Sequence, residues 1–211
     1  MSYKAFARMD IAIIGNEATT VTLAQGLAFA GHRIFIGTNE NEVEKLELLT
    51  QQFDNILVAT IADVAPNADI IIMATTPDNV REAAYLLDDV RKKVIIDISY
   101  MNSPNSTNYL NSLSAIKAIT GSPYLVKCFN AAGFSPSPKQ AKNDAINMFL
   151  AGDNLKAKEI AKLIARDLGY AECHDFGGSD SASLLDEMAI CYHHLLTRKQ
   201  GEKIAIRITK G

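Results

Sequence analysis

Hydrophobic residues recur along the chain in short uninterrupted runs that alternate with stretches of helical periodicity. The runs are rich in isoleucine and valine and lie at Ile11 to Ile14, Arg33 to Ile36, Ile70 to Ala74 and Val94 to Ile98. Such runs are typical of strands buried on both faces, as in a parallel sheet covered by helices. Helical patterns separate them, at Thr20 to Ala30, Glu42 to Gln52 and Asn79 to Asp88. The alternation predicts a doubly wound α/β fold.

The same pattern continues in the second half of the chain after a polar interruption. Met101 to Asn108 contains a proline and predicts a loop. Two more strands are predicted at Tyr124 to Phe129 and Asn147 to Ala151, followed by a helix from Leu155 to Leu168 that ends at Gly169.

The C-terminal segment predicts one more helix and an edge strand. Ser181 or Ser183 would cap the helix, which extends to about Leu196, and Lys203 to Ile208 alternates like a strand at a sheet edge. We therefore expect a single Rossmann-like domain over residues 1–211 with a mostly parallel sheet, in which residues 178–211 form a C-terminal extension of helix and edge strand.

The composition argues against several classes of binding partner. The net charge of −3 argues against a nucleic-acid binder, because such proteins usually carry a basic face. Three widely spaced cysteines without a C-x-x-C pair fit reduced thiols in the cytosol. No stretch approaches the roughly 20 apolar residues of a membrane span. We expect a cytoplasmic protein that binds neither nucleic acid nor membranes.

The segment from Met9 to His32 has the layout of a dinucleotide-binding unit: a buried strand, a glycine turn, a helix and a second strand. Its glycine motif is altered, because the three positions of G-x-G-x-x-G hold Gly15, Glu17 and Thr20. A carboxylate near the pyrophosphate costs about 1 kcal/mol in water and several in a cleft of lower dielectric. Two interpretations stay open: weakened dinucleotide binding, or a retained fold in which Glu17 only stabilises the positive end of the helix.

The tip of the second strand bears on the choice between NAD and NADP. NAD enzymes place an acid there, whereas NADP enzymes place a hydroxyl residue and an arginine around the 2′-phosphate. This chain has Thr38 and Asn39, which can donate to a phosphate, without the arginine. The tip favours NADP over NAD.

A family resemblance emerges from short motifs that occur in a fixed order. They are I-A-I-I-G at Ile11 to Gly15, A-G-H at Ala30 to His32, G-T at Gly37 to Thr38, A-T-T-P at Ala74 to Pro77, I-D-I-S at Ile96 to Ser99, V-K-C-F-N at Val126 to Asn130, A-G-D at Ala151 to Asp153 and D-F-G at Asp175 to Gly177. In this order they resemble the NADP oxidoreductases that depend on the deazaflavin coenzyme F-420. They are also similar to the cytosolic reductase domain of six-transmembrane metalloreductases, over about residues 9 to 197. Pyrroline-5-carboxylate reductases share only the N-terminal half.

The resemblance implies hydride exchange between NADPH and a flavin-like ring, either deazaflavin or FMN/FAD. The cofactors carry such chemistry, so no protein nucleophile is expected. By position, the resemblance implies that the pyrophosphate contacts Gly15, Asn16, Glu17 and Ala18, and that the adenosine contacts Thr38 and Asn39. It implies that the nicotinamide ribose contacts Thr75, Thr76 and Pro77. The second ring would lie against Ser99 to Asn102 and against Asn130, Ala131 and the segment to Gly133.

Several other polar residues have competing interpretations. His193 and His194 point about 100° apart on a helix and cannot bind one metal ion together, which favours a core or interface role. Lys127 would bind an acidic ring substituent or phosphate, or else be solvated. Asp97 would hydrogen-bond the amides of Ser99 and Tyr100, or act as a general base. No metal site is predicted.

Two functions remain as hypotheses. The first is a cytoplasmic NADP-dependent oxidoreductase with a deazaflavin or flavin-type acceptor, acting as a homodimer through the apolar stripe from Leu184 to Leu196. The second is a catalytically degenerate protein kept as a binding or scaffolding module, suggested by Glu17, Thr20 and Asn39. Titration with NADPH and NADH distinguishes them.

Overall fold

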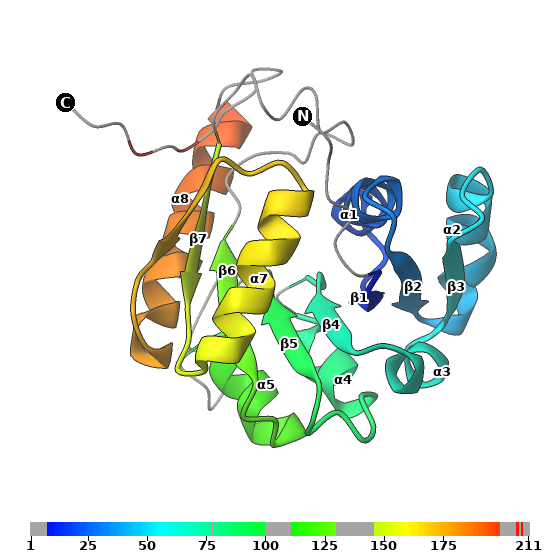
Figure 1. The fold of residues 1–211 in the computed structure, drawn as a ribbon, viewed down its shortest axis with the longest axis horizontal. Coiled ribbons are helices and arrows are strands. Elements are labelled where there is room, and N and C mark those ends of the chain that lie inside the picture. Colours follow the sequence, from blue (N-terminus) through cyan, green and yellow to red (C-terminus); the bar gives the residue numbers. More distant parts are fainter. Residues whose placement is uncertain are drawn as a thin grey trace.

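The computed structural model describes residues 8–76, 78–99, 111–129 and 146–198, together with Ile206 and Ile208. Within them, eight strands form one sheet flanked by helices on both faces (Figure 1). The strands are β1 (Asp10–Ile14), β2 (Arg33–Thr38), β3 (Ile56–Thr60), β4 (Ile70–Met73), β5 (Val94–Asp97), β6 (Leu125–Phe129), β7 (Asn147–Ala151) and β8 (Glu172–Asp175). Their order is β3-β2-β1-β4-β5-β6-β7-β8, and every neighbouring pair is parallel except β6 and β7.

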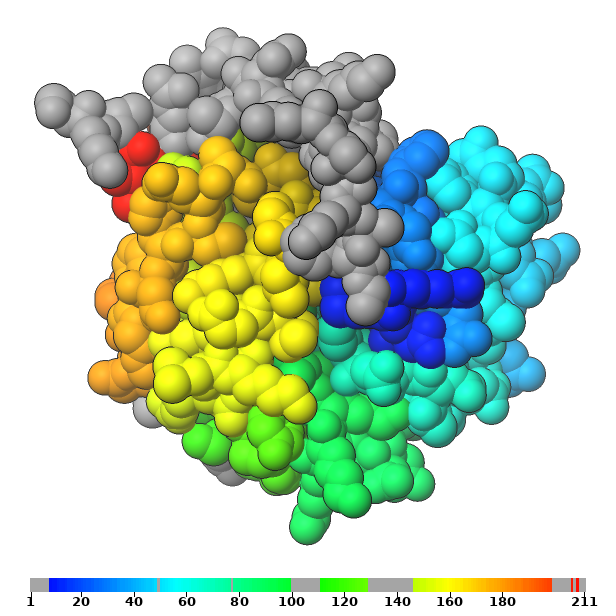
Figure 2. Space-filling model, viewed as in Figure 1, coloured from blue at the N-terminus to red at the C-terminus, as the bar shows by residue number. Residues whose placement is uncertain are grey.

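The helices cover the two faces in separate groups. They are α1 (Ala18–Phe29), α2 (Val43–Thr50), α3 (Ile61–Val64), α4 (Val80–Tyr85), α5 (Ser112–Thr120), α7 (Leu155–Asp167) and α8 (Ala182–Arg198). Helices α1, α2 and α7 pack on one face, whereas α3, α4, α5 and α8 pack on the other. In the space-filling view α7 occupies the middle of the first face, between the N-terminal strands and the C-terminal segment (Figure 2). The doubly wound architecture predicted from the sequence is confirmed.

The strand residues explain why both faces are covered. In β1, Ile11 and Ile13 contribute to one hydrophobic core and Ala12 and Ile14 to the other, and all four are fully buried. Successive side chains of a strand point to opposite faces, so a run of apolar residues needs a helix layer on each side. Strands made of these isoleucine runs are therefore suited to the centre of the sheet.

The order of the strands creates a crevice at one edge of the sheet. The chain runs from β1 outward to β2 and β3, then crosses back and continues from β4 on the other side of β1. The connections that follow β1 and β4 leave the sheet toward opposite faces, and ligands of open α/β sheets bind where the connections part in this way. The crevice lies at the carboxyl ends of β1, β2 and β4.

Some elements differ from the sequence-based expectations. Strands β3 and β8 and helices α3 and α5 were not among the predicted segments. Helix α8 begins at Ala182, after a short 3₁₀ turn at Ser179–Ser181. Ser183 therefore does not cap the helix, and its Oγ instead accepts a hydrogen bond from the side-chain nitrogen of Asn111 at 3.0 Å.

The predicted polar loop and most of the predicted tail strand lie outside the described residues. Met101 to Asn108 lies outside the described residues, as does most of Lys203 to Ile208. Ile206 and Ile208 are described, and neither lies in a strand. The backbone N–H of Ile208 donates to Asn147 Oδ1 at 2.7 Å, beside β7. Of the helices in the described part of the chain, none has the length and apolar character required to cross a bilayer.

Candidate dinucleotide cleft

A cleft occupies the crevice at the carboxyl ends of β1, β2 and β4. Residues from the loops after these strands line it together with residues of α3 and α4: Gly15, Asn16, Gly37, Thr38, Asn39, Ile61, Thr75, Thr76, Asn79, Glu82, Ala83 and Leu86. Six of the residues predicted from the sequence thus meet in one place: Gly15, Asn16, Thr38, Asn39, Thr75 and Thr76. The sequence interpretation missed the wall that α3 and α4 provide, although the helical pattern of α4 was visible.

Gly15 makes the tight turn at the base of the cleft. Its N–H donates to the carbonyl oxygen of Gly37 at 3.0 Å, which joins the ends of β1 and β2. A Cβ at this position would lie 2.4 Å from the carbonyl oxygen of Ala74 and 2.5 Å from Thr20 Oγ1. Only glycine fits such a close approach of backbone to backbone. The first position of the glycine motif is therefore intact.

Thr20 occupies the third position of the motif, and its side chain is fully buried against Gly15. The third glycine normally allows close packing of helix and strand. Here the threonine side chain fits beside the turn because Gly15 itself lacks a side chain. The threonine at the third position of the motif is therefore accommodated by packing against Gly15 and does not block the turn.

Glu17 stands at the N-terminal boundary of α1, and its side chain makes no capping hydrogen bond. It lines a hollow between α1 and α2 together with Ala18, Val21 and Lys45, next to the cleft. The cleft itself is lined by Asn16 from this loop and not by Glu17. The carboxylate therefore lies beside the expected pyrophosphate path. Its side chain still adds negative charge at the positive end of α1.

The tip of β2 has the polar character expected from the sequence. Thr38 is the last residue of β2 and is buried, whereas Asn39 is exposed. The following 3₁₀ turn, Glu40–Glu42, is acidic, and the ammonium group of Lys45 lies 2.9 Å from Glu42 Oε2. Lys45 is thus a cation close to this end of the cleft.

Thr75 lines the cleft, and its hydroxyl group has no protein partner. Its Oγ1 is buried and forms no hydrogen bond within the protein. Buried polar atoms are nearly always paired in native proteins, so an unpaired one at the wall of a cleft fits a ligand that supplies the partner. A ribose hydroxyl or a phosphate oxygen has the required chemistry.

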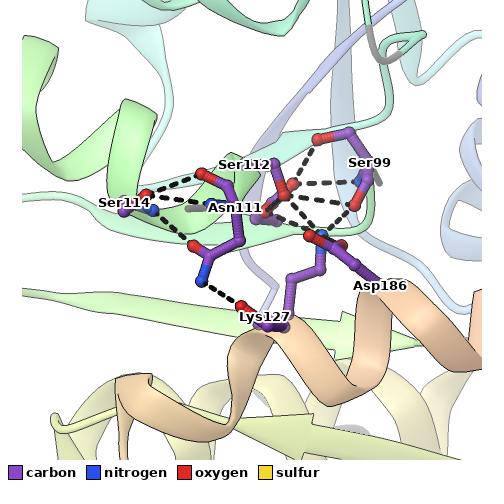
Figure 3. A network of polar contacts seen from close by, with 8 residues as sticks. Ser99, Asn111, Ser112, Ser114, Lys127 and Asp186 are labelled. Atoms are coloured by element: carbon purple, nitrogen blue, oxygen red, sulfur yellow. Dashed lines mark hydrogen bonds and ion pairs between the residues drawn. The ribbon is translucent and has the colours of Figure 1, made fainter. Parts of the chain in front are cut away.

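A buried polar network lies behind Ser99, at the carboxyl end of β5 and the middle of β6 (Figure 3). The Nζ of Lys127 lies 3.0 Å from Asp97 Oδ2 and 2.7 Å from Asp186 Oδ1. The same ammonium group donates to Ser112 Oγ at 2.6 Å and to the carbonyl oxygen of Ser99. The network joins β5, β6, α5 and α8 through one lysine.

Asp97 holds the segment after β5 as well as the lysine. Its Oδ1 accepts from the backbone N–H of Ser99 at 3.0 Å and from the Ser99 hydroxyl, and its Oδ2 accepts from Ser112 Oγ at 2.5 Å. The expected hydrogen bond from a loop amide to Asp97 is confirmed at Ser99. Tyr100 lies outside the described residues.

The charges of this network shift one another's proton affinity. Burial alone would lower the pKa of Lys127, but the facing carboxylates of Asp97 and Asp186 raise it above its usual value. Burial raises the pKa of Asp186, against the opposing effect of Lys127. Lys127 is 1% exposed. The interpretation of Lys127 as a solvated side chain is therefore wrong. Its ammonium group is instead paired with two aspartates, Asp97 and Asp186.

The remaining predicted site residues are distributed as follows. Ser99 is buried above the lysine network, and Ala18 lines the hollow beside the cleft together with Glu17. Pro77, Asn130 and Ala131 lie outside the described residues, as does the segment to Gly133. In the described ranges, no cluster of three or more histidine, cysteine, aspartate or glutamate side chains has the arrangement of a metal site.

Comparison with known proteins agrees with this picture. The chain superposes on a candidate F420-dependent NADP reductase from Arthrobacter sp. FB24 with a TM-score of 0.80, 22% identity and coverage of 96% of this chain and 100% of the other. A hypothetical protein from Sinorhizobium meliloti gives a TM-score of 0.66 at 21% identity, covering 84% of this chain and 89% of the other. An imine reductase from Myxococcus stipitatus, in complex with NAD+, gives 0.64 at 18% identity, covering 92% of this chain and 64% of that protein.

These likenesses and the strand order define the chain as a Rossmann-like α/β protein. Residues 10–101 match the model of one family in particular, the coenzyme F420-dependent NADP oxidoreductases. The resemblance expected from the sequence is thereby confirmed over the part of the chain that carries β1 to β5. No curated protein sequence matches the chain.

Proposed function

We propose that the protein is a cytoplasmic, NADP-dependent oxidoreductase, a single dinucleotide-binding domain over residues 1–211, that transfers a hydride between NADPH and a deazaflavin or flavin-type acceptor. The observation that carries the proposal is the unpaired hydroxyl of Thr75 in a cleft whose base is the Gly15 turn. The family match over residues 10–101 supports a nicotinamide cofactor in that cleft.

The residues present fit such a cofactor. Gly15 and Asn16 would hold the pyrophosphate, because the backbone can approach closely where a Cβ has no room. Thr38 and Asn39 would contact the 2′-phosphate, and Thr75 and Thr76 the nicotinamide ribose. Bound NADPH would supply the hydride, and the protein would supply position and surroundings.

The acceptor ring would lie beyond the nicotinamide, toward Ser99 and the predicted residues Asn130 and Ala131. Deazaflavin follows from the family, and FMN or FAD has a ring of similar shape. The structural likeness to an imine reductase adds a cyclic imine as an acceptor to be assayed beside them. Comparing NADPH oxidation with 5-deazariboflavin, FMN and 2-methyl-1-pyrroline under identical conditions identifies the acceptor class.

Replacing Thr75 with valine is expected to weaken NADPH binding about five- to tenfold, the equivalent of one hydrogen bond of ~1–1.5 kcal/mol. Stability should not fall, because the hydroxyl has no protein partner to lose. The measurement is a fluorescence titration with NADPH, and with NADH in parallel. The control is Thr22→Val, whose hydroxyl donates to the carbonyl of Ala18 on the exposed side of α1.

The titration also decides between the two functional hypotheses. Micromolar binding of NADPH by the unaltered protein supports the oxidoreductase. Absence of saturation up to millimolar NADPH and NADH refutes it and leaves the binding or scaffolding module, for which the altered positions Glu17, Thr20 and Asn39 are the reason.

We further propose that two copies associate through the outward face of α8. Leu184, Ile190 and Leu195 are 50%, 37% and 46% exposed along that face. Light scattering should give twice the mass of one chain, and Leu184→Glu with Leu195→Glu should return the monomer. Leu155→Glu on α7, where the leucine is 76% exposed, serves as the control. A monomeric mass for the unaltered protein would contradict the dimer.

A further inference from the structure

Two buried threonine hydroxyls lie at the turn that forms the base of the cleft, and neither has a hydrogen-bond partner among the described residues. One is Thr75 Oγ1, and the other is Thr20 Oγ1. Thr20 is the third residue of α1, is 0% exposed and occupies the third glycine position of the motif. Because buried polar atoms are nearly always paired, the hydroxyl of Thr20 needs an explanation beyond packing.

Three other helical threonines show how such a hydroxyl is ordinarily satisfied. Thr22, Thr50 and Thr120 each donate to the carbonyl oxygen four residues earlier, at 2.8, 2.9 and 2.8 Å. This bond to the preceding turn is open to any threonine inside a helix. The hydroxyl of Thr20 makes no such bond to the carbonyl oxygen of Asn16. Its hydrogen is therefore available to an acceptor that is not part of the described chain.

The hydroxyl of Thr20 lies against the turn at Gly15. A Cβ built on Gly15 would stand 2.5 Å from Thr20 Oγ1 and still closer to the carbonyl oxygen of Ala74. The hydroxyl is therefore near the residues that directly follow β1 and β4. Gly15 lines the cleft, and so does Thr75, the residue after Ala74. Thr20 Oγ1 thus lies beside the backbone that would approach the pyrophosphate.

From this placement we propose that the Thr20 hydroxyl donates a hydrogen bond to a pyrophosphate oxygen of the dinucleotide, an inference that rests on the proposed function. A phosphate oxygen only accepts, so it complements a hydroxyl whose hydrogen has no acceptor in the described chain. The backbone amides at the start of α1 face the same anion. The donor at the third motif position thereby offsets part of the affinity that the charge of Glu17, at the second, costs.

Two substitutions at this position separate hydrogen bonding from packing. Thr20→Val keeps the shape of the side chain and removes the hydroxyl, whereas Thr20→Ser keeps the hydroxyl and removes the methyl group. In a fluorescence titration, Thr20→Val should bind NADPH about tenfold more weakly than the unaltered protein, the equivalent of one hydrogen bond to a charged group. Thr20→Ser should bind more tightly than Thr20→Val. A residue that only fills space beside Gly15 would give the opposite order.

Thr50 provides a matched control, because it is a buried helical threonine whose hydroxyl is paired. It is 3% exposed, and its Oγ1 donates to the carbonyl oxygen of Leu46 within α2. Thr50→Val should lower the midpoint of urea denaturation and leave NADPH affinity unchanged. Thr20→Val should do the reverse, because its hydroxyl has no bond within the described chain to lose.

A series of nucleotides tests which part of the dinucleotide the hydroxyl contacts. NADPH, NADH and ADP all carry the two linked phosphates, whereas ADP lacks the nicotinamide ribose. By calorimetry, Thr20→Val should weaken the binding of all three by the same factor. Thr75→Val should weaken the binding of NADPH and NADH and leave that of ADP unchanged. If Thr20→Val bound ADP as tightly as the unaltered protein does, the assignment to the pyrophosphate would be wrong.

The same titrations separate failure of this inference from failure of the proposed function. Micromolar binding of NADPH by the unaltered protein, with equal affinity in Thr20→Val, refutes the contact with Thr20 and leaves the proposed function intact. Absence of binding of all three nucleotides by the unaltered protein, up to millimolar concentration, refutes both together. A loss of affinity in Thr20→Val that is smaller in Thr20→Ser and absent in Thr50→Val supports the donor.

Discussion

Replacement of Lys127 by methionine is expected to lower the free energy of unfolding by about 3–5 kcal/mol, the cost of breaking a buried ion pair from one side. The variant would leave Asp97 and Asp186, 0% and 5% exposed, facing each other without a cation. It would also remove the donors to Ser99 and Ser112. Urea denaturation at pH 7 measures the loss.

Two further variants test this reason for the loss. Lys117→Met removes an exposed pair, in which the lysine lies 3.5 Å from Asp153 and both side chains are 57% exposed, and should cost less than about 1 kcal/mol. Adding Asp186→Asn to Lys127→Met should recover part of the stability, because one uncompensated charge is removed. A loss in Lys127→Met no greater than that in Lys117→Met would contradict the buried network.

Replacement of Gly15 by alanine is expected to weaken NADPH binding at least tenfold and to lower the free energy of unfolding by about 1–3 kcal/mol. The new Cβ would stand 2.4 Å from the carbonyl oxygen of Ala74, which belongs to the backbone and cannot rotate away. The turn between β1 and α1 must then widen, and the backbone that approaches the pyrophosphate moves with it. Fluorescence titration and urea denaturation measure the two effects.

The matched control is Gly26→Ala, within α1. Its Cβ would meet only the end of the Leu168 side chain, at 3.0 Å, and alanine favours the helix by about 1 kcal/mol over glycine. We expect NADPH affinity to stay the same and stability to change by less than about 1 kcal/mol. If Gly15→Ala binds NADPH as tightly as the unaltered protein, Gly15 does not form the base of the cofactor site.

The parts of the fold that the sequence predicts are those with continuous apolar runs. Strands β1, β2, β4 and β5 are such runs, because a strand buried on both faces admits few polar residues. Strand β8 has no such apolar run and was therefore not predicted. It reads Glu172 to Asp175, with both end residues exposed, because it is the edge strand beside β7. Edge strands lack the burial that makes a pattern visible.

The candidate site was foreseen where it follows strand ends and missed where it depends on tertiary contact. Thr38 is the last residue of β2 and Thr75 follows β4 by two residues, so parallel topology alone brings them together. Ile61 and Leu86 line the cleft because α3 and α4 pack beside it, which no local motif specifies. Lys127 illustrates the same limit, since its partner Asp186 lies 59 residues further along the chain.

The reversed direction of β7 decides which way the last helix runs along the sheet. Because β7 descends where its neighbour β6 ascends, the turn after β8 lies at the amino side of the sheet, and α8 must climb back. Had β7 been parallel to β6, the same helix would have descended and presented its C-terminal turns to the opposite edge. One antiparallel strand thus sets the direction of α8, whose Asp186 reaches back to Lys127 in the middle of β6.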